Sequence, residues 1–578
     1  MAGRPPPGAA GRFGNIRAPC PRARATSMHT KSPLHTDPIR LGIFGWGVVA
    51  PRSPDIDAFE RNLSQSESWL SPFRGFGPSN FLVGTPEFDF ARYKEWIDQR
   101  FEPRKYAQLD SKMGWNAKFA IGAFIQSLGQ NPGIEEVLRD LGSEAHVYVA
   151  TGLGDLSTIY GQSVHYHYAQ RHWDRFWCRE QHNPELAAYR ALPPAGREAR
   201  RGELGAPRDP TDLAPEDPAL DEALDEWLHF WTFRSSGLQA YLAEAREIEA
   251  EGVGADVEAS KGNVIRRKVS ARRKLNQRYG CPPEPWTSVD ASLLWNIANI
   301  AASQISILGG ITGPAFAPVG ACASFGLGLH LAANAVRLGQ AKAVVVGATD
   351  GPPHPLVVAA FFAARVLATH GEVSKPLTGM RGTHVAGGSC VWIVGDYDYF
   401  TALGMKPLGL EILGIGVTSD ADHIITPSEE GPRAAIGHAL HDAAVEPHEL
   451  AAWDMHATAT PGDWTELLTA LSVFPEAKAI TARKGTFGHG MSVCGGWELT
   501  AQHLGMARGV LHPVHVSEDE LHPLIQPHVG RLVRDEATPV QGAVSGKISM
   551  GVGGINSCVI CRRWAEDEAP PAETPPAG

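Results

Sequence analysis

The chain has 578 residues, of which 43% are hydrophobic and 20% are charged, and these values are typical of globular proteins. A formal net charge of −11 argues against a general affinity for nucleic acid. No apolar run reaches the roughly 18–20 residues that a membrane span needs, so we expect no membrane span. Eight widely scattered cysteines favour reduced thiols and a cytoplasmic location over a disulfide-linked protein.

Both ends of the chain are expected to be disordered. Residues 1–38 are rich in proline, arginine and glycine, carry no acidic residue before Asp37, and lack the apolar core of a signal peptide. Their composition resembles a transit peptide, although the prolines argue against an amphipathic helix, and Met28 is an alternative start. Residues 566–578 are rich in proline, alanine and glutamate, which also predicts disorder.

Between these ends, strand patterns alternate with helix patterns. Residues 39–49 and 145–153 predict buried strands, and residues 111–127 predict a helix. Later strands are expected at residues 341–347, 391–394, 451–455, 543–549 and 555–561. Later helices are expected at residues 322–338, 432–444, 463–473 and 494–508. This alternation of apolar strands and helices predicts an α/β protein whose sheets are buried on both faces.

Residues 160–285 differ from the rest in composition, with more charged and aromatic residues, and predict a mostly helical insertion. Tyr160, Val164 and Tyr168 recur at helical spacing, and so do Trp227 and Trp231. A stretch rich in proline, glycine, arginine and aspartate, residues 192–218, is expected to be a linker between the helices.

Four motifs contain residues suited to chemistry. Cys322 follows a small-residue turn and precedes an apolar helix, whose N-terminus would favour its thiolate. His456 leaves a predicted strand into a loop, DMHATATPGDWTE. Lys484 stands five positions before His489 in ARKGTFGHGMSVCGG. The fourth motif, SMGVGGINSCV, is a glycine-rich loop at residues 549–559 that permits close backbone approach.

In this chain order the motifs resemble those of the β-ketoacyl synthases, the condensing enzymes of fatty acid and polyketide synthesis. SKPLTGMRG, at residues 374–382, is similar to another stretch of that family. The resemblance implies a thiolase-like fold, in which two similar halves form α-β-α-β-α layers and the protein is a homodimer. The halves would span residues 39–395, interrupted by the insertion, and residues 396–565.

The same resemblance implies a role for each motif residue. Cys322 would carry the acyl group, His456 and His489 would stabilise the decarboxylating malonyl thioester, and Lys484 would position the histidines. The backbone N–H groups of Cys322 and Val552 would form an oxyanion hole. The remaining residues implied are two pantetheine-binding threonines, Thr458 and Thr460, and five residues that shape the site: Asp463, Glu466, Gly551, Gly553 and Gly554.

The chain also departs from the family pattern. Ala457 replaces the glycine that usually follows the first histidine, and Val552 replaces a bulky phenylalanine that gates the acyl pocket. These departures leave the acyl chain length, the starter unit and the pathway open.

A basic cluster lies at helical spacing inside the insertion. It is either a solvated helix face or a docking surface for an acidic acyl carrier protein. Its members are Arg266, Arg267, Lys268, Arg272, Arg273 and Lys274. Four histidines of the insertion favour a packed or interface surface over a metal site, so no metal is expected; they are His165, His167, His172 and His182.

Several functions remain open. The first is a β-ketoacyl synthase that condenses an acyl thioester with a malonyl thioester by decarboxylation. It would use acyl- and malonyl-loaded carrier protein, or acyl-CoA, without a cofactor. A thiolase is disfavoured because Cys558 is not followed by the required Cys-x-Gly pattern. The alternatives are a non-catalytic partner that sets chain length and a decarboxylase or acyl transferase that does not condense.

Overall fold

The computed structural model describes residues 39–76, 81–250, 252, 257–424, 428–475 and 479–565. The two terminal segments expected to be disordered lie outside these residues. The fold lies within the unit Ile39–Gly578.

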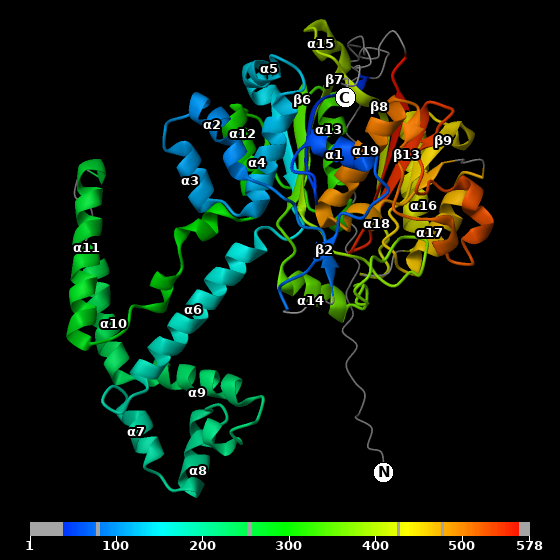
Figure 1. Cartoon of the computed structure of the whole chain (residues 1–578). Coiled ribbons are helices and arrows are strands. Elements are labelled where there is room, and N and C mark those ends of the chain that lie inside the picture. Colours follow the sequence, from blue (N-terminus) through cyan, green and yellow to red (C-terminus); the bar gives the residue numbers. More distant parts are fainter. Residues whose placement is uncertain are drawn as a thin grey trace, which may run out of the picture. The chain divides into compact units, whose positions relative to one another are not determined.

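The ten strands of the main sheet fall into two halves that repeat one arrangement (Figure 1). In each half the two outermost pairings are parallel and the two innermost are antiparallel. From the edge inwards, the first half is β5 (Ala315–Phe316), β4 (Ala145–Ala150), β6 (Ala343–Asp350), β7 (Gly388–Asp396) and β1 (Leu41–Val49). The second half is β10 (Ile480–Thr481), β9 (Leu450–Asp454), β13 (Val544–Gly551), β14 (Ile555–Arg563) and β8 (Leu408–Ser419). Antiparallel pairing of β1 with β8 joins the halves.

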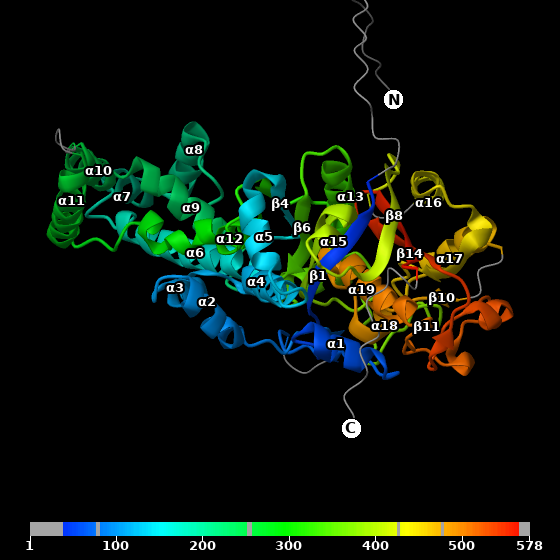
Figure 2. The ribbon, with the colours of Figure 1, turned by 90° about the horizontal axis from the view of Figure 1, so that it is seen from above.

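Helices cover the strands in three layers (Figure 2). α4 (Trp115–Leu128) and α12 (Ile300–Gly309) pack on the first half. α16 (Glu430–Ala443) and α17 (Gly462–Val473) pack on the second. α13 (Ser324–Arg337) and α19 (Cys494–Ala507) contact each other and strands of both halves. The expected α-β-α-β-α fold of two similar halves is therefore confirmed.

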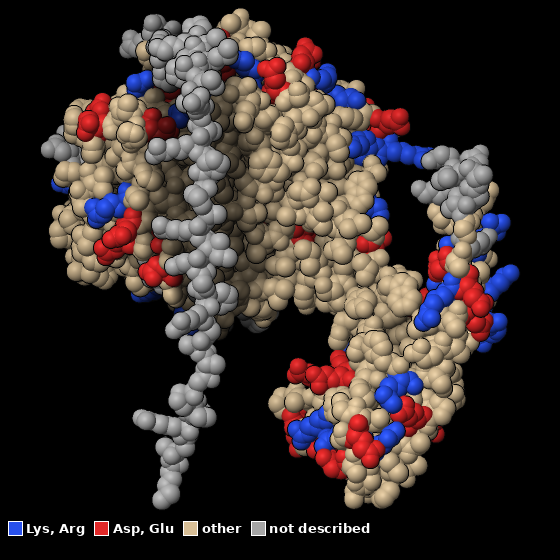
Figure 3. All heavy atoms as spheres, turned by 180° about the vertical axis from the view of Figure 1, so that it is seen from behind, with Lys and Arg blue, Asp and Glu red and all other residues tan. Residues whose placement is uncertain are grey.

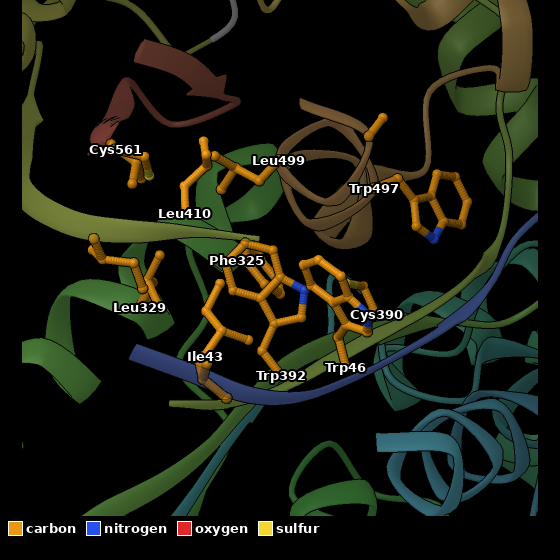
Figure 4. Close-up of a cluster of buried hydrophobic side chains, with 14 of the residues drawn as sticks. Ile43, Trp46, Phe325, Leu329, Cys390, Trp392, Leu410, Trp497, Leu499 and Cys561 are labelled. Carbon is orange, nitrogen blue, oxygen red and sulfur yellow. The ribbon is translucent and has the colours of Figure 1, made fainter. Parts of the chain in front are cut away.

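Small residues let the central helices approach the sheet and each other. A Cβ at Gly326 of α13 would lie 2.8 Å from Ser557 Cβ, and one at Gly496 of α19 would lie 2.7 Å from Phe325 Cδ2. Large aromatic side chains fill the remaining space, as Figure 4 shows, with the Phe325 and Trp392 rings 5.1 Å apart. Burial of this apolar surface fixes α13 and α19, and hence the turns that precede them, against both halves.

The insertion leaves β4 and returns at α12. Its helices are α6 (Leu156–Trp177), α7 (Pro184–Arg190), α8 (Pro194–Leu204), α9 (Leu220–Arg234), α10 (Ser236–Glu249) and α11 (Val257–Tyr279). The prediction of a linker was wrong for α8. Pro194 suits the first helical turn and Gly205, with φ +61°, ends the helix, so these residues bound a helix rather than a loop.

Shorter elements connect the layers. They are α1 (Ile56–Leu63), β2 (Ser71–Pro72), β3 (Leu82–Val83), α2 (Lys94–Arg100), α3 (Lys105–Lys112), α5 (Ile134–Leu141), α14 (Pro355–Ala363), α15 (Tyr397–Ala402), α18 (Lys484–Phe487), β11 (Val510–Leu511) and β12 (Thr538–Pro539). Within the described ranges, no helix is long and apolar enough to cross a bilayer.

Candidate active site

The carboxyl ends of the parallel strands in the second half bring three of the motifs together. The sheet register pairs Thr481 of β10 and Lys547 of β13 with Asp454, the last residue of β9. His456 follows β9 by two residues and Lys484 follows β10 by three. The glycine-rich loop begins where β13 ends. Residues far apart in sequence therefore emerge at one edge of the sheet.

Cys322 lies in a 3-10 turn, Ala321–Ala323, directly before α13. Ala321 has φ +47°, and Met491 has φ +55° in the matching turn, Met491–Val493, directly before α19. The duplicated halves thus use the same strained turn at the start of each central helix. Cys322 is buried and, together with His456 and His489, lines a cavity of about 430 Å³.

Burial dominates the acidity of the cysteine. It raises the pKa of Cys322 to about 11, against the lowering effects of the Lys484 charge and of hydrogen bonding from the backbone of Val552 and of Cys322 itself. Burial thus opposes the thiolate expected at a helix N-terminus, and α13 begins two residues after Cys322.

Two neutral histidines face the same cavity. Burial, reinforced by the charge of Lys484, lowers the pKa of both His456 and His489 well below its ordinary value. The Met491 N–H donates to His489 Nδ1 at 3.2 Å, and the Lys484 ammonium, which can only donate, lies 3.4 Å from His456 Nδ1. Each ring therefore carries its proton on Nε2. The rings are 5.5 Å apart and nearly perpendicular.

Lys484 belongs to a buried triad of charges. Its Nζ lies 2.7 Å from one oxygen of Glu498, and Lys547 Nζ lies 2.8 Å from the other. Lys484 also donates to the His456 carbonyl, and Lys547 donates to the Met455 carbonyl at 3.2 Å. Burial is the largest single effect and lowers the pKa of Lys484, but the charge and hydrogen bond of Glu498 and the charges of other nearby groups together outweigh it, so the pKa is raised. The triad fixes the backbone on both sides of His456.

Two carboxyl groups of α17 hold the loop that carries His456. Glu466 accepts the N–H of His456 at 2.5 Å and of Ala457 at 2.8 Å. Asp463 accepts the N–H of Thr458 at 2.8 Å and of Ala459 at 3.0 Å. Burial raises the pKa of Asp463 to about 6 and that of Glu466 to about 7.

The predicted pantetheine-binding threonines line the cavity. Thr458 and Thr460 lie together, with 3.0 Å between their hydroxyl oxygens. The stretch at residues 374–382 contacts the same loop. Leu377 donates to Asp463 at 3.1 Å, and the Gly382 N–H donates to the Ala459 carbonyl at 2.9 Å.

The glycine-rich loop closes over the cysteine. A Cβ at Gly551 would lie 2.6 Å from the Gly320 carbonyl and 3.2 Å from the Cys322 nitrogen, so only glycine fits there. Gly553 and Gly554 have φ +94° and +74°, values that favour glycine. This geometry places the Val552 N–H at the sulfur while leaving the Val552 side chain 52% exposed.

The basic cluster is divided between two environments on α11. Lys268 and Arg272 pair with Glu249, and Arg272 lies 3.3 Å from Glu284. The other four side chains are exposed: Arg266, Arg267, Arg273 and Lys274. Figure 3 shows acidic and basic side chains mixed over the insertion. Among the side chains of α11 that the structure describes, none lines the cavity.

The histidines of the insertion are not gathered into one site. His165, His167 and His172 are exposed on α6, and His167 lies 3.7 Å from Asp225. No group of three or more side chains suited to a metal occurs within the part of the chain that the structure describes. The cysteines within this part are all free thiols.

Sequence reasoning missed Glu498, Lys547 and Asp350. Two of them could have been found from a charge in an otherwise apolar segment: Glu498 lies in the predicted helix at WELT, and Lys547 lies in the predicted strand at GKIS. Asp350, at the end of β6, accepts Ser492 N–H and Gly152 N–H, both at 2.9 Å, and so ties the turn before α19 to the first half.

These features define a class of protein: a thiolase-like fold with a buried cysteine and two neutral histidines in one cavity. Comparisons with known proteins identify the family. Residues 248–394 match the model of the β-ketoacyl synthase N-terminal domain, and residues 410–517 match that of the C-terminal domain. The chain belongs to the β-ketoacyl synthase family. The first match begins inside the predicted insertion.

Curated relatives agree with this assignment. The mitochondrial 3-oxoacyl-[acyl-carrier-protein] synthase of Arabidopsis thaliana is 30% identical over 46% of this chain and 59% of its own length. The 3-oxoacyl-[acyl-carrier-protein] synthase 2 of Vibrio cholerae is 30% identical over 46% of this chain and 66% of its own length. The alignments thus cover less than two thirds of these relatives.

Solved structures share the fold at lower identity. The ishigamide ketosynthase/chain length factor has a TM-score of 0.62 at 17% identity and covers 92% of this chain and 100% of its own. A complex of a type II polyketide acyl-carrier protein with its ketosynthase bound to the hexaketide has a TM-score of 0.59 at 16% identity, with 92% and 100% coverage.

Proposed function

We propose that the protein is a condensing enzyme that joins an acyl thioester, held on Cys322, to a malonyl thioester with loss of CO₂. One observation carries the proposal: two imidazoles have their Nδ1 atoms occupied, so both Nε2–H groups are left for a substrate in the cavity that holds Cys322.

The first half-reaction loads the cysteine. Cys322 Sγ attacks the acyl carbonyl carbon, the bond to the pantetheine sulfur breaks, and the thiol proton ends on the leaving thiol. The N–H groups of Cys322 and Val552 flank the sulfur, where the carbonyl oxygen gains negative charge. Because the pKa of the thiol is raised, proton loss accompanies attack rather than preceding it.

The second half-reaction forms the new carbon–carbon bond. The malonyl carboxylate leaves as CO₂, and its electron pair moves onto the thioester as an enolate whose oxygen accepts hydrogen bonds from His456 and His489 Nε2. The enolate carbon then attacks the acyl carbonyl, and Cys322 leaves as a thiolate that takes a proton from water. Neutral histidines suit this role because they donate without holding the malonyl carboxylate as an ion pair.

A non-catalytic partner that sets chain length is the alternative. Val552 favours this alternative, since the loop that covers Cys322 carries a half-exposed valine in place of the bulkier phenylalanine usual in the family. The preserved Cys322, His456 and His489, gathered in one cavity, favour catalysis more strongly because a non-reacting subunit has no need of them.

The partners belong to the same proposal. Acyl and malonyl groups would arrive on an acidic carrier protein, or the acyl group on CoA, and the exposed basic side chains of α11 are the docking candidates. Charge reversal of Arg266 and Arg273 should then weaken carrier-protein binding, whereas unchanged affinity would exclude α11.

The free cysteines of the described part support a cytoplasmic location.

A homodimer is also proposed. Strand β5 ends the sheet, and Phe316 on β5 and Ile307 on α12 are 40% and 51% exposed. Figure 3 shows a broad area of the body with few charged side chains. Interface cores are depleted in charge in the same way.

Intact-protein mass spectrometry tests the function. The protein is incubated with acyl-CoA or acyl-carrier protein, and malonyl-carrier protein is then added. We expect an acyl adduct on Cys322 that the malonyl donor discharges, with no adduct on Cys322→Ala. His456→Ala should keep the adduct but discharge it roughly 10²–10³-fold more slowly. If wild type and Cys322→Ala both stay unmodified by every donor, the alternative function replaces this one.

A further inference from the structure

The chain around His456 lies beyond the end of β9, where charged side chains bind its backbone. Glu466 accepts the His456 N–H, and Lys484 donates to the His456 carbonyl. Lys547 donates to the carbonyl of the preceding residue, Met455, at 3.2 Å. The backbone on either side of the imidazole is thus held by charges from three elements: α17, α18 and β13.

The ammonium of Lys547 is fixed on three sides. It donates to the carbonyls of Met455 and Ile548, and it lies 2.8 Å from an oxygen of Glu498. The side chain is 1% exposed, so these contacts are shielded from water and each is stronger than it would be at the surface. Lys547 therefore holds the Met455 carbonyl in one position.

The two lysines of the triad differ in what their charges reach. The charge of Lys484 lowers the pKa of Cys322 as well as that of His456 and His489. The charge of Lys547 also lowers the pKa of both histidines, but it is not among the main influences on the pKa of Cys322. Among the described residues that line the cavity, Lys547 is absent. Its position thus suits an action on the histidines and not on the cysteine.

We propose that Lys547 is a positioning residue for the second half-reaction alone: through Met455 and Glu498 it sets where His456 Nε2–H meets the malonyl thioester. This inference rests on the proposed condensing function. As CO₂ leaves, the electron pair moves onto the thioester oxygen, which accepts the hydrogen bond, and Lys547 keeps its proton throughout. Loading of Cys322 does not need Lys547.

Separate rates for the two half-reactions test this role. Intact-protein mass spectrometry follows loading of Cys322 from the acyl-carrier protein that wild type accepts best, and then discharge by malonyl-carrier protein. In Lys547→Met we expect loading close to the wild-type rate and discharge slowed by about 10–100-fold, because a misplacement of about 1 Å can cost 10²-fold. KM for malonyl-carrier protein should stay unchanged, since Lys547 does not line the described cavity.

Three further variants control for damage to the fold. Ser545→Ala removes a hydrogen bond to Gln502 two residues away on the same strand, and should change neither rate. Gly437→Ala, on the exposed face of α16 with open space around it, should also leave both rates unchanged. Lys547→Arg keeps the charge and should recover part of the discharge rate lost in Lys547→Met.

A double variant tests whether the effect passes through His456. His456→Ala alone should slow discharge by roughly 10²–10³-fold. Adding Lys547→Met should then slow discharge little further, because residues that act as a unit do not lose their effects additively. Losses that multiply would show that Lys547 acts elsewhere and would overturn the proposal.

The pH profile of discharge is a readout that a purely structural role would not move. The groups that act on His456 are Lys484, Lys547, Glu466 and the neighbouring imidazole of His489. Loss of the Lys547 charge raises the pKa of both histidines and of Glu466, so the acid-side fall in rate should begin at a higher pH in Lys547→Met. The control variants should keep the wild-type profile.

The outcomes separate the inference from the function on which it rests. If no thioester loads Cys322 in the wild-type protein, the condensing function fails. If wild type loads and discharges, but Lys547→Met slows both steps in parallel or slows neither, the function stands and the role of Lys547 is wrong.

Discussion

Cys322 shows how burial outweighs local electrostatics at a single residue. A helix N-terminus and a nearby ammonium both favour a thiolate, yet exclusion of water raises the pKa of the thiol to about 11. In the proposed reaction, burial therefore favours loss of the thiol proton during attack on the thioester rather than before it.

Alkylation of Cys322 should follow this pKa. The thiolate fraction rises about tenfold per pH unit below the pKa, so the iodoacetamide reaction rate should climb through pH 7, 8 and 9 without levelling. Peptide mass spectrometry would follow the modified residue, with Cys322→Ala as the control. A reaction rate that levels off below pH 8 would instead support the helix-stabilised thiolate expected from the sequence.

We expect substitutions in the buried charge triad to lower the free energy of unfolding by unequal amounts. Glu498→Gln leaves Lys484 and Lys547 buried without their shared carboxylate, and breaking a buried pair in this way costs about 3–5 kcal/mol. Lys547→Met keeps the Lys484–Glu498 pair and should cost less. Urea unfolding would measure both, and an equal loss in the two variants would contradict this account.

At the scale of an element, the close packing of the glycine-rich loop against the turn that holds Cys322 sets the position of the loop backbone. Gly551 touches the Gly320 carbonyl because it lacks a side chain, and this contact sets where the Val552 N–H lies. The sequence shows glycines there, but only the packing shows which one is needed for close approach and which are needed for positive φ.

Gly551→Ala should displace the loop from the cysteine. A misplacement of about 1 Å at a reacting centre can cost 10²-fold, so we expect loading of Cys322 to slow by about 10–100-fold. Stopped incubations followed by intact mass spectrometry would measure it. Gly437→Ala serves as the control, and loading at the wild-type rate in Gly551→Ala would show that the loop contact is unimportant.

Elements also show where sequence patterns mislead. The proline and glycine content of residues 192–218 predicts a linker, but Pro194 and Gly205 stand at the two ends of α8, where these residues are favoured. The insertion helices begin at Leu156 because Asp155 caps α6 by accepting the Thr158 N–H at 2.8 Å. Composition alone does not separate a capped helix from a loop.

At the scale of the whole molecule, the duplication organises the site. Each half supplies a strained turn before its central helix, but only the first turn carries a cysteine, while the second half supplies His456, Lys484 and His489. Asp350 joins the two by binding Ser492. Neither half holds the complete site.

Association through the β5 edge gives a prediction at this scale. Phe316→Glu places a charge on the exposed, unpaired edge of the sheet and should convert a dimer into a monomer. Sedimentation velocity would measure the change, and Phe233→Glu, on the insertion, is the control at another exposed aromatic residue. A dimer that persists in Phe316→Glu would exclude this edge.

The sequence by itself determined the family and the α/β alternation and predicted the candidate residues Cys322, His456, Lys484 and His489, because these depend on local spacing and on motif order along the chain. The tertiary structure decided which groups lie against the Nδ1 atoms of the histidines, how deeply the cysteine is buried and that a second lysine pairs with Glu498. Those properties arise from water exclusion and from contacts between strands and helices that are distant in sequence. No local pattern encodes them.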